Sequence, residues 1–94
     1  MDFLKEMGYK SLLSNIKQSN DEALIYSFIC NSNNAKEVIN YFQSIGIMVI
    51  DQLLVKRLEI FTINIEKIKS AFDNYDLDIL VQLINEDINT LSFL

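Results

Sequence analysis

The chain contains no histidine, tryptophan or proline, only two glycines, and one cysteine among its 94 residues. Without histidine it lacks the side chain used most often for proton transfer near neutral pH and for metal ligation. A single cysteine cannot form an internal disulfide. Because proline is absent and glycine is rare, helix breaks are expected at clusters of asparagine, serine and aspartate, whose side chains bond to nearby backbone groups.

Long apolar runs are also missing. The longest stretch without a charged or strongly polar side chain extends only from Ile45 to Ile50, far short of the roughly 20 residues that a membrane-spanning helix needs. The second residue, Asp2, is acidic, where the start of a secretory signal would be basic. No Asn-x-Ser/Thr glycosylation site is present. Together with the lone cysteine, these features predict a cytoplasmic protein with no membrane contact.

Half of the residues are apolar, and their spacing is that of amphipathic helices. Apolar side chains recur every three or four positions in six segments, around residues 12–16, 24–29, 34–45, 50–58, 64–72 and 77–91. Asn34 and Asn64 are predicted to cap the third and fifth helices, and Gly46 to end the third. The sequence therefore predicts a single all-α domain over residues 1–94. A competing interpretation makes strands of 45–50 and 58–63, which are rich in β-branched residues.

An internal repeat of about 30 residues is suggested by sliding the chain against itself. The identical pairs at this offset are Asn34/Asn64, Phe42/Phe72, Gln52/Gln82 and Leu53/Leu83. A looser match extends the scheme toward the N-terminus, which gives units at 5–33, 34–63 and 64–94. Periods of this length are typical of stacked helical hairpins, the architecture that we predict. Any two hairpins of equal length in an Ile/Leu-rich chain would also align apolar with apolar.

Residues 38–72 carry a pattern of motifs in a fixed order. The motifs are Phe42-Gln43-Ser44-Ile45-Gly46-Ile47, Leu53-Leu54, Arg57-Leu58-Glu59-Ile60-Phe61 and Glu66-Lys67-Ile68. This segment resembles the helical repeat of the mitochondrial transcription termination factor family, although Leu58 stands where that family has proline. The resemblance implies a solenoid of helical pairs that binds nucleic acid on a basic concave face.

Charge is distributed unevenly along the chain. Residues 1–69 carry eight basic and eight acidic side chains, whereas residues 70–94 carry five acids and no base, which accounts for the net charge of −5. The acids are Asp73, Asp76, Asp78, Glu86 and Asp87. Such a segment attracts basic surfaces and repels phosphate. A smaller group of basic residues could still contact nucleic acid: Lys56, Arg57, Lys67 and Lys69. The simpler interpretation is that these are ordinary solvated side chains.

No pattern for catalysis or metal binding is found. The C-terminal acids lack the register of a calcium loop, and we expect them to cap a helix and to form a solvated face. Cys30 is expected to be buried filler, because no histidine or second cysteine accompanies it. No phosphate loop, nucleophile elbow or zinc spacing occurs. The sequence therefore predicts a protein without enzymatic activity and without a cofactor or metal.

The surplus of apolar side chains favours an interaction function. Six aromatics need shelter, which exceeds what a small three-hairpin core buries easily; they are Tyr9, Tyr26, Tyr41, Phe61, Tyr75 and Phe93. Tyrosines could instead remain half-exposed with their hydroxyls in water. We predict a protein-interaction, regulatory or inhibitory module that binds a protein with a basic surface, or its own copy. Its expected contact residues are Tyr41, Phe61, Tyr75, Asp76, Asp78, Glu86 and Asp87. The alternative hypothesis is a small nucleic-acid-binding module.

Overall fold

The computed structural model describes all residues, 1–94, and contains helices but no strands. The α-helices are α1 (Asp2–Glu6), α2 (Leu13–Ser19), α3 (Glu22–Cys30), α4 (Ser32–Ser44), α5 (Ile50–Lys56), α6 (Ile65–Phe72) and α7 (Leu77–Glu86). Three 3₁₀-helices join or follow them: η1 (Lys10–Leu12), η2 (Leu58–Thr62) and η3 (Ile88–Phe93). The prediction of an all-α fold is confirmed. The expected count of six helices is too low, and the alternative with strands at 45–50 and 58–63 is wrong.

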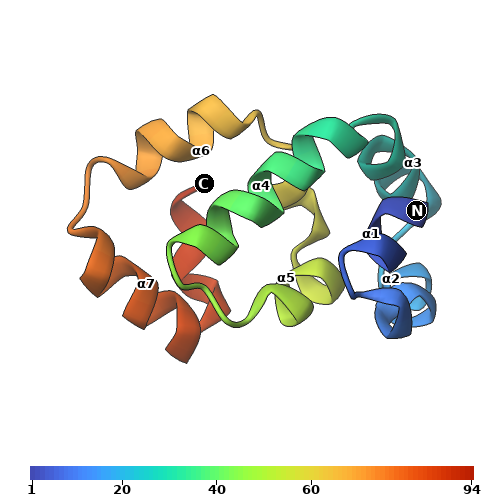
Figure 1. Cartoon of the computed structure of the whole chain (residues 1–94), viewed down its shortest axis with the longest axis horizontal. Coiled ribbons are helices and arrows are strands. Elements are labelled where there is room, and N and C mark those ends of the chain that lie inside the picture. The colour runs from blue at the N-terminus through green and yellow to red at the C-terminus, as the bar shows by residue number, and fades with distance from the viewer.

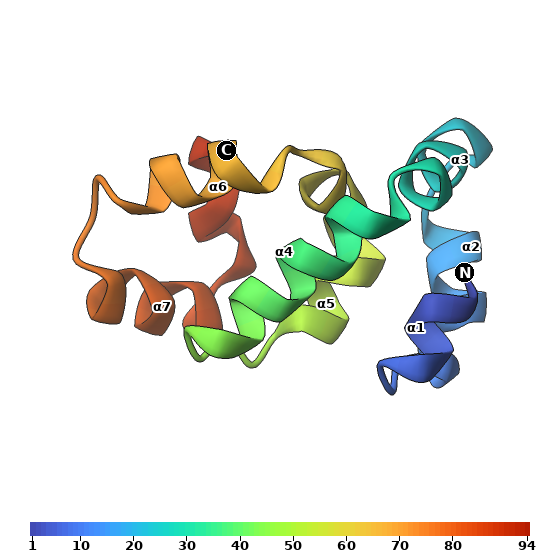
Figure 2. The same ribbon diagram turned by 45° about the horizontal axis from the view of Figure 1, so that its top comes forward.

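The elements follow one another along the long axis of the molecule. Figures 1 and 2 show α1, α2 and α3 at one end, α4 and α5 in the middle, and α6 and α7 at the other end. Helix α4 is the longest and packs against α3, α5, α6 and η2. It therefore connects the two ends of the molecule.

Both glycines end helices in the left-handed conformation. Gly46, with φ of +96°, follows α4, and Gly8, with φ of +94°, follows α1. After α4, the amide of Gly46 donates to the carbonyl of Gln43, and that of Ile47 to the carbonyl of Phe42. These two bonds form a Schellman motif, which satisfies the last carbonyls of a helix. The predicted role of Gly46 is confirmed.

The two asparagines expected to act as equivalent caps behave differently. Asn64 accepts a hydrogen bond from the amide of Glu66 and caps α6, as predicted. Helix α4, however, begins at Ser32, so that Asn34 lies inside its first turn. The Asn34 side chain instead reaches the start of α6, where it bonds to the backbone of residues 61–65. The predicted cap at Asn34 is wrong because a tertiary contact takes its side chain.

The last predicted helix is divided in two. Helix α7 ends at Glu86, and Asp87 has extended backbone angles, φ −151° and ψ 114°. The Asp87 carboxylate then accepts from the amide of Asn89 and begins η3. The chain turns at this point, so that η3 packs back against α7 (Figure 2). The prediction of one continuous helix over 77–91 is wrong after residue 86.

The core consists entirely of hydrophobic side chains, and every buried residue belongs to it. A continuous row of aromatic rings runs through it, with neighbouring centroids 5.0–6.4 Å apart, in the order Phe3, Phe28, Phe61, Phe42, Phe72, Phe93, Tyr75. Each such pair adds roughly 0.5–1.5 kcal/mol beyond the area it buries. Cys30, expected in the core, is exposed at the end of α3. That expectation is wrong because α3 buries mainly Phe28.

No helix combines the length and apolar character required to cross a bilayer.

Candidate functional site

Large apolar side chains are exposed mainly at the C-terminal end. Of the eight that the structure exposes, five lie between residues 75 and 93: Tyr75, Leu77, Ile79, Leu83 and Phe93. The other three, Tyr26, Ile29 and Met48, belong to α3 and to the loop before α5. Isolated exposed apolar residues are normal on a protein surface, whereas a cluster of them marks a contact site. The C-terminal cluster is therefore the first candidate.

Four residues of the cluster, all except Leu77, line a groove, which we call the C-terminal groove. It lies between the α6–α7 turn, α7 and η3, and has a volume of about 520 Å³. Leu80 lies in it among Tyr75, Asp76, Ile79, Leu83, Thr90 and Phe93. The rings of Tyr75 and Phe93 are 5.0 Å apart and end the aromatic row of the core. The groove thus opens where the apolar interior reaches the surface.

Local backbone structure fixes both ends of the groove. The Asp76 carboxylate accepts hydrogen bonds from the amides of Asp78 and Ile79 and so starts α7. At the other end, the Thr90 hydroxyl donates to the carbonyl of Leu83 and ties η3 to α7. Helix α7 buries Leu80, Val81 and Ile84 on its inner side. Its Ile79 and Leu83 side chains are left 58% and 46% exposed on the outer side.

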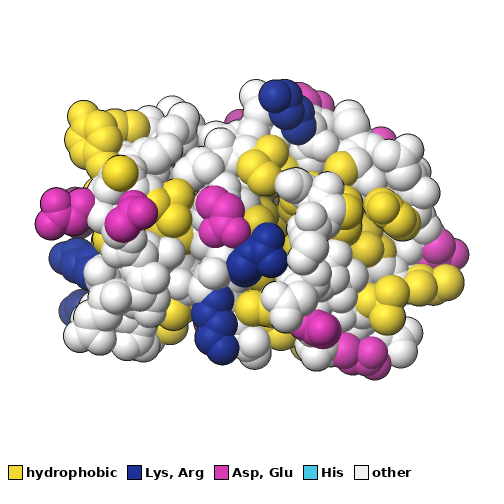
Figure 3. All heavy atoms as spheres, turned by 180° about the vertical axis from the view of Figure 1, so that it is seen from behind, with side chains coloured by type: hydrophobic (Ala, Val, Ile, Leu, Met, Phe, Trp, Pro, Cys, Tyr) yellow, Lys and Arg dark blue, Asp and Glu magenta, His cyan; other side chains and the backbone are white.

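One acid lines the groove, and others lie on the same helix. Asp76 is part of its lining, and Asp78 and Glu86 are exposed on the same helix. No basic residue occurs between 70 and 94, and neither of the two ion pairs in the structure involves the C-terminal acids. Figure 3 shows hydrophobic side chains at the surface over the end formed by α6, α7 and η3, with acidic side chains near its edge. The groove is therefore mainly apolar, and the helix that forms one side of it has an acid at each end, Asp76 and Glu86.

Two of the predicted contact residues line this groove, and three others belong to the same segment of the chain. Tyr75 and Asp76 line it, and Asp78, Glu86 and Asp87 are exposed on or directly after α7. Phe61 is a correction: its side chain is completely buried between Phe28 and Phe42, so it cannot contact a partner while the protein is folded. Phe61 was predicted to be exposed because we expected a core too small to bury all of the aromatic side chains.

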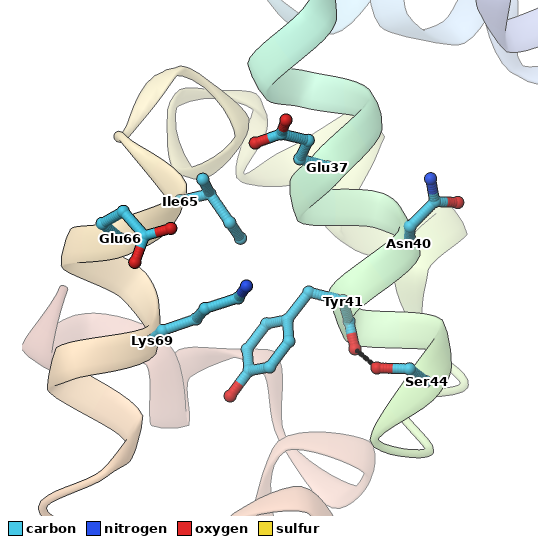
Figure 4. A pocket seen from close by; sticks show the side chains of 7 residues that line it. All are labelled: Glu37, Asn40, Tyr41, Ser44, Ile65, Glu66 and Lys69. Atoms are coloured by element: carbon cyan, nitrogen blue, oxygen red, sulfur yellow. Dashed lines mark hydrogen bonds between the residues drawn. The ribbon is translucent and has the colours of Figure 1, made fainter.

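Tyr41 lies elsewhere, in a polar cleft between α4 and α6 of about 450 Å³. Figure 4 shows its ring pointing between the two helices, with Lys69 opposite it and Glu37 and Glu66 on the two walls. The Lys69 Nζ is 5.6 Å from the ring centroid. Burial of the ring, and then the negative charge of Asp73, raise the pKa of the Tyr41 hydroxyl. Tyr41 is thus partly enclosed and separate from the C-terminal groove.

The four basic residues of the nucleic-acid hypothesis are divided among different surroundings. Lys56 is exposed at the end of α5, and Arg57 donates from Nε to Glu59 over 2.7 Å. Lys69 lines the α4/α6 cleft. Lys67 lines another hollow with Ile63, Ala71, Phe93 and Leu94. Lys67 and Lys69 are therefore not brought into one pocket.

Ile79 and Leu83 were not among the predicted contact residues, and Phe93 was predicted only to need shelter. A signal for the first two was present in the sequence, because apolar residues occupy both sides of the helix from Leu77 to Ile84. An apolar face wider than a single stripe indicates that more than one neighbour covers the helix. The position of Phe93 depends on the turn at Asp87, for which the cap residue Asp87 is the only local signal.

No three cysteine, aspartate or glutamate side chains lie close enough together to hold a metal ion. Comparison with known proteins gives no match to any family model, curated protein or solved structure.

Proposed function

We propose that this protein is a non-enzymatic interaction module whose contact surface is the C-terminal groove. The observation that supports the proposal is that four of the eight exposed large apolar side chains line one groove. Burying such side chains against a partner is favourable by roughly 25 cal/mol per Å² of apolar surface. Aromatic side chains in a partly enclosed pocket are also the usual anchors of protein interfaces.

The proposal includes a repeated helical unit at 34–63 and 64–94. Helix α5 ends at Lys56 and η2 begins at Leu58, and the corresponding boundaries thirty residues later are Glu86 and Ile88. In a stack of such units each apolar face packs on a neighbour, and a free face is normally polar. Because the outer side of α7 carries apolar residues, we expect another element to cover it.

Site-specific cross-linking in the cell that makes the protein tests this function. A photoreactive amino acid is placed at Leu83 in the groove, and at the exposed Gln52 of α5 as a matched control. We expect a discrete protein adduct from position 83 and none from position 52. Adducts from neither position, or equal labelling from both, would contradict the proposal. Thermal unfolding of both variants checks that the fold is intact.

The nucleic-acid hypothesis remains the alternative function, supported by the resemblance of residues 38–72 and by the four basic side chains within that segment. If it holds, affinity for DNA or RNA will fall steeply as salt rises, because phosphate contacts release counterions. Replacing Lys56, Arg57, Lys67 and Lys69 with glutamine would then remove the binding. Absence of binding at low salt would reject this alternative.

A further inference from the structure

We infer that the C-terminal groove binds a cationic amphipathic helix of a partner protein, with basic residues on both sides of a pair of apolar anchors. This inference rests on the proposed interaction function and adds the chemical class of the partner. It depends on the order of side chains along the outer side of α7 and on the charge around the groove.

The outer side of α7 presents an acid, two apolar residues and a second acid in line. Asp76, Ile79, Leu83 and Glu86 are spaced by three, four and three residues, so they lie on one side of the helix. Ile79 and Leu83 line the groove, and Asp76 lies at its N-terminal end. With a rise of about 1.5 Å per residue, the two acids are roughly 15 Å apart along the axis.

These acids have no ion-pair partner within the molecule. The ion pairs in the structure are Lys5 with Asp2 and Arg57 with Glu59, both outside the C-terminal segment. The Asp76 carboxylate caps α7 and forms no ion pair. A partner that covers Ile79 and Leu83 lowers the local dielectric around the carboxylates, which strengthens their attraction to a cation. The groove therefore favours a partner that carries charge of the opposite sign.

A second copy of this chain fits the groove poorly. Two identical groove faces packed on each other by a twofold axis would bring each set of acids against its copy. The apolar side chains exposed elsewhere, Tyr26, Ile29 and Met48, are distributed over α3 and a loop. An anionic membrane surface is disfavoured by the same carboxylates.

The spacing on α7 defines what the partner must present. A helix lying along α7 needs apolar residues three or four positions apart to enter the groove, as in other helix-in-groove contacts. Basic residues about ten positions apart then fall beside Asp76 and Glu86. The pattern is basic, apolar, apolar, basic, with successive spacings of three or four residues.

Synthetic peptides provide the test. The first is an alanine-based helix with two leucines and two lysines in this pattern, the second has glutamate in place of lysine, and the third has its leucines moved to opposite faces. Anisotropy of a labelled peptide measures binding to the full chain at low and moderate salt. We expect the lysine peptide to bind at least about tenfold more tightly than the glutamate peptide, with a smaller difference at higher salt. The third peptide should bind weakly.

Matched variants separate the groove from general attraction to an acidic protein. We expect Glu86→Gln to weaken binding of the lysine peptide several-fold and Glu22→Gln, an exposed acid on α3, to leave it unchanged. Ile79→Gln should abolish it. Both Ile79 and Glu86 are exposed, so the variants should fold, which circular dichroism checks.

Each contrary result overturns the inference in a distinguishable way. Equal loss of affinity in Glu22→Gln and Glu86→Gln would show diffuse charge attraction. Equal binding of the lysine and glutamate peptides, abolished by Ile79→Gln, would overturn charge selection and leave the interaction function standing. If no peptide binds but the cross-linker at position 83 gives a protein adduct, the inference about the partner's charge is overturned and the interaction function stands. If neither peptide binding nor cross-linking is found, the interaction function is rejected as well. If the chain forms a dimer that Leu83→Gln dissociates, the groove binds a second copy of the chain and not a helix of another protein.

Discussion

At the scale of single residues, asparagine side chains connect parts of the chain that are distant in sequence. Asn20 donates to the carbonyl of Val55, and Asn85 joins α7 to the loop after α4 through Gly46 and Met48. Asn34 makes three such bonds: Nδ2 donates to the carbonyls of Phe61 and Ile63, and Oδ1 accepts from the amide of Ile65. These contacts satisfy backbone groups at element ends, where helices lack internal partners.

Replacing Asn34 with alanine should therefore destabilise the fold. The change leaves one amide and two carbonyls of a partly buried segment without their partner, which costs about 2–3 kcal/mol. Asn33→Ala is the matched control, because that side chain is exposed and makes no bond to the protein, and should change stability by less than about 0.5 kcal/mol. Urea unfolding followed by circular dichroism measures both. Equal stability of the two variants would contradict the assigned role of Asn34.

Tyr41 gives a prediction about pH. Burial, followed by the charge of Asp73, raises the pKa of its hydroxyl in the folded protein. An unfolded tyrosine ionises near its ordinary value of about 10, so above that pH the unfolded state releases its proton first. The neutral Tyr41 hydroxyl therefore contributes its full stability at pH values below the pKa of the unfolded state. This contribution is lost as the pH rises through the pKa of the folded state.

Absorbance titration of the phenol groups measures this effect. The difference between the wild-type and Tyr41→Phe curves isolates Tyr41 and should show its transition above the ordinary pKa. Asp73→Asn should move that transition partly back, since the charge is the smaller of the two causes. A Tyr41 transition at or below the ordinary value would show that the ring is not enclosed as the structure has it.

Residue roles that depend on neighbours in sequence could be predicted, whereas those set by tertiary contacts could not. Asn64 and Gly46 act within one turn of their own helices, and both were predicted correctly. Asn34, Cys30 and Phe61 were predicted wrongly because a distant backbone segment, an exposed helix end and the aromatic core decide their surroundings.

At the scale of elements, the two helix ends with glycine differ in their surroundings. A Cβ added at Gly46 would lie 3.7 Å from Val81, an ordinary contact, and one added at Gly8 would meet nothing within 4 Å. Any cost of substitution by alanine therefore comes from the positive φ and not from a clash.

Gly8→Ala and Gly46→Ala should consequently destabilise the protein by similar amounts, about 1–2 kcal/mol each. Chemical denaturation of both single variants measures this. A loss at Gly46 several times that at Gly8 would mean that space beside Val81, and not backbone conformation, limits this turn.

The break in the last helix shows why apolar periodicity misplaced an element. The apolar residues of η3, Ile88 and Leu91, continue the steps of three and four that run through α7. A 3₁₀-helix also brings residues three apart onto one side, so the pattern passes through the turn without interruption. The only local signal is Asp87, which caps η3 as aspartates commonly cap helices.

At the scale of the whole molecule, the aromatic row explains both the core and the groove. It begins with Phe3 in α1, passes through α3, η2, α4 and α6, and ends at Phe93 and Tyr75. Every ring is buried except these last two. The sequence predicted a surplus of aromatics and an acidic C-terminal segment, but only the folded arrangement places them at one surface.

The central claim is that the C-terminal groove, and no other exposed apolar side chain, is the contact surface. Titrating the isotopically labelled protein with the leucine/lysine helical peptide and following backbone amides by NMR tests it most directly. We expect saturable shifts concentrated in α7 and η3, from Leu77 to Phe93, with α1, α2 and α3 unchanged. Shifts centred on Tyr26 and Ile29 of α3, or at the α4/α6 cleft around Tyr41, would contradict the account.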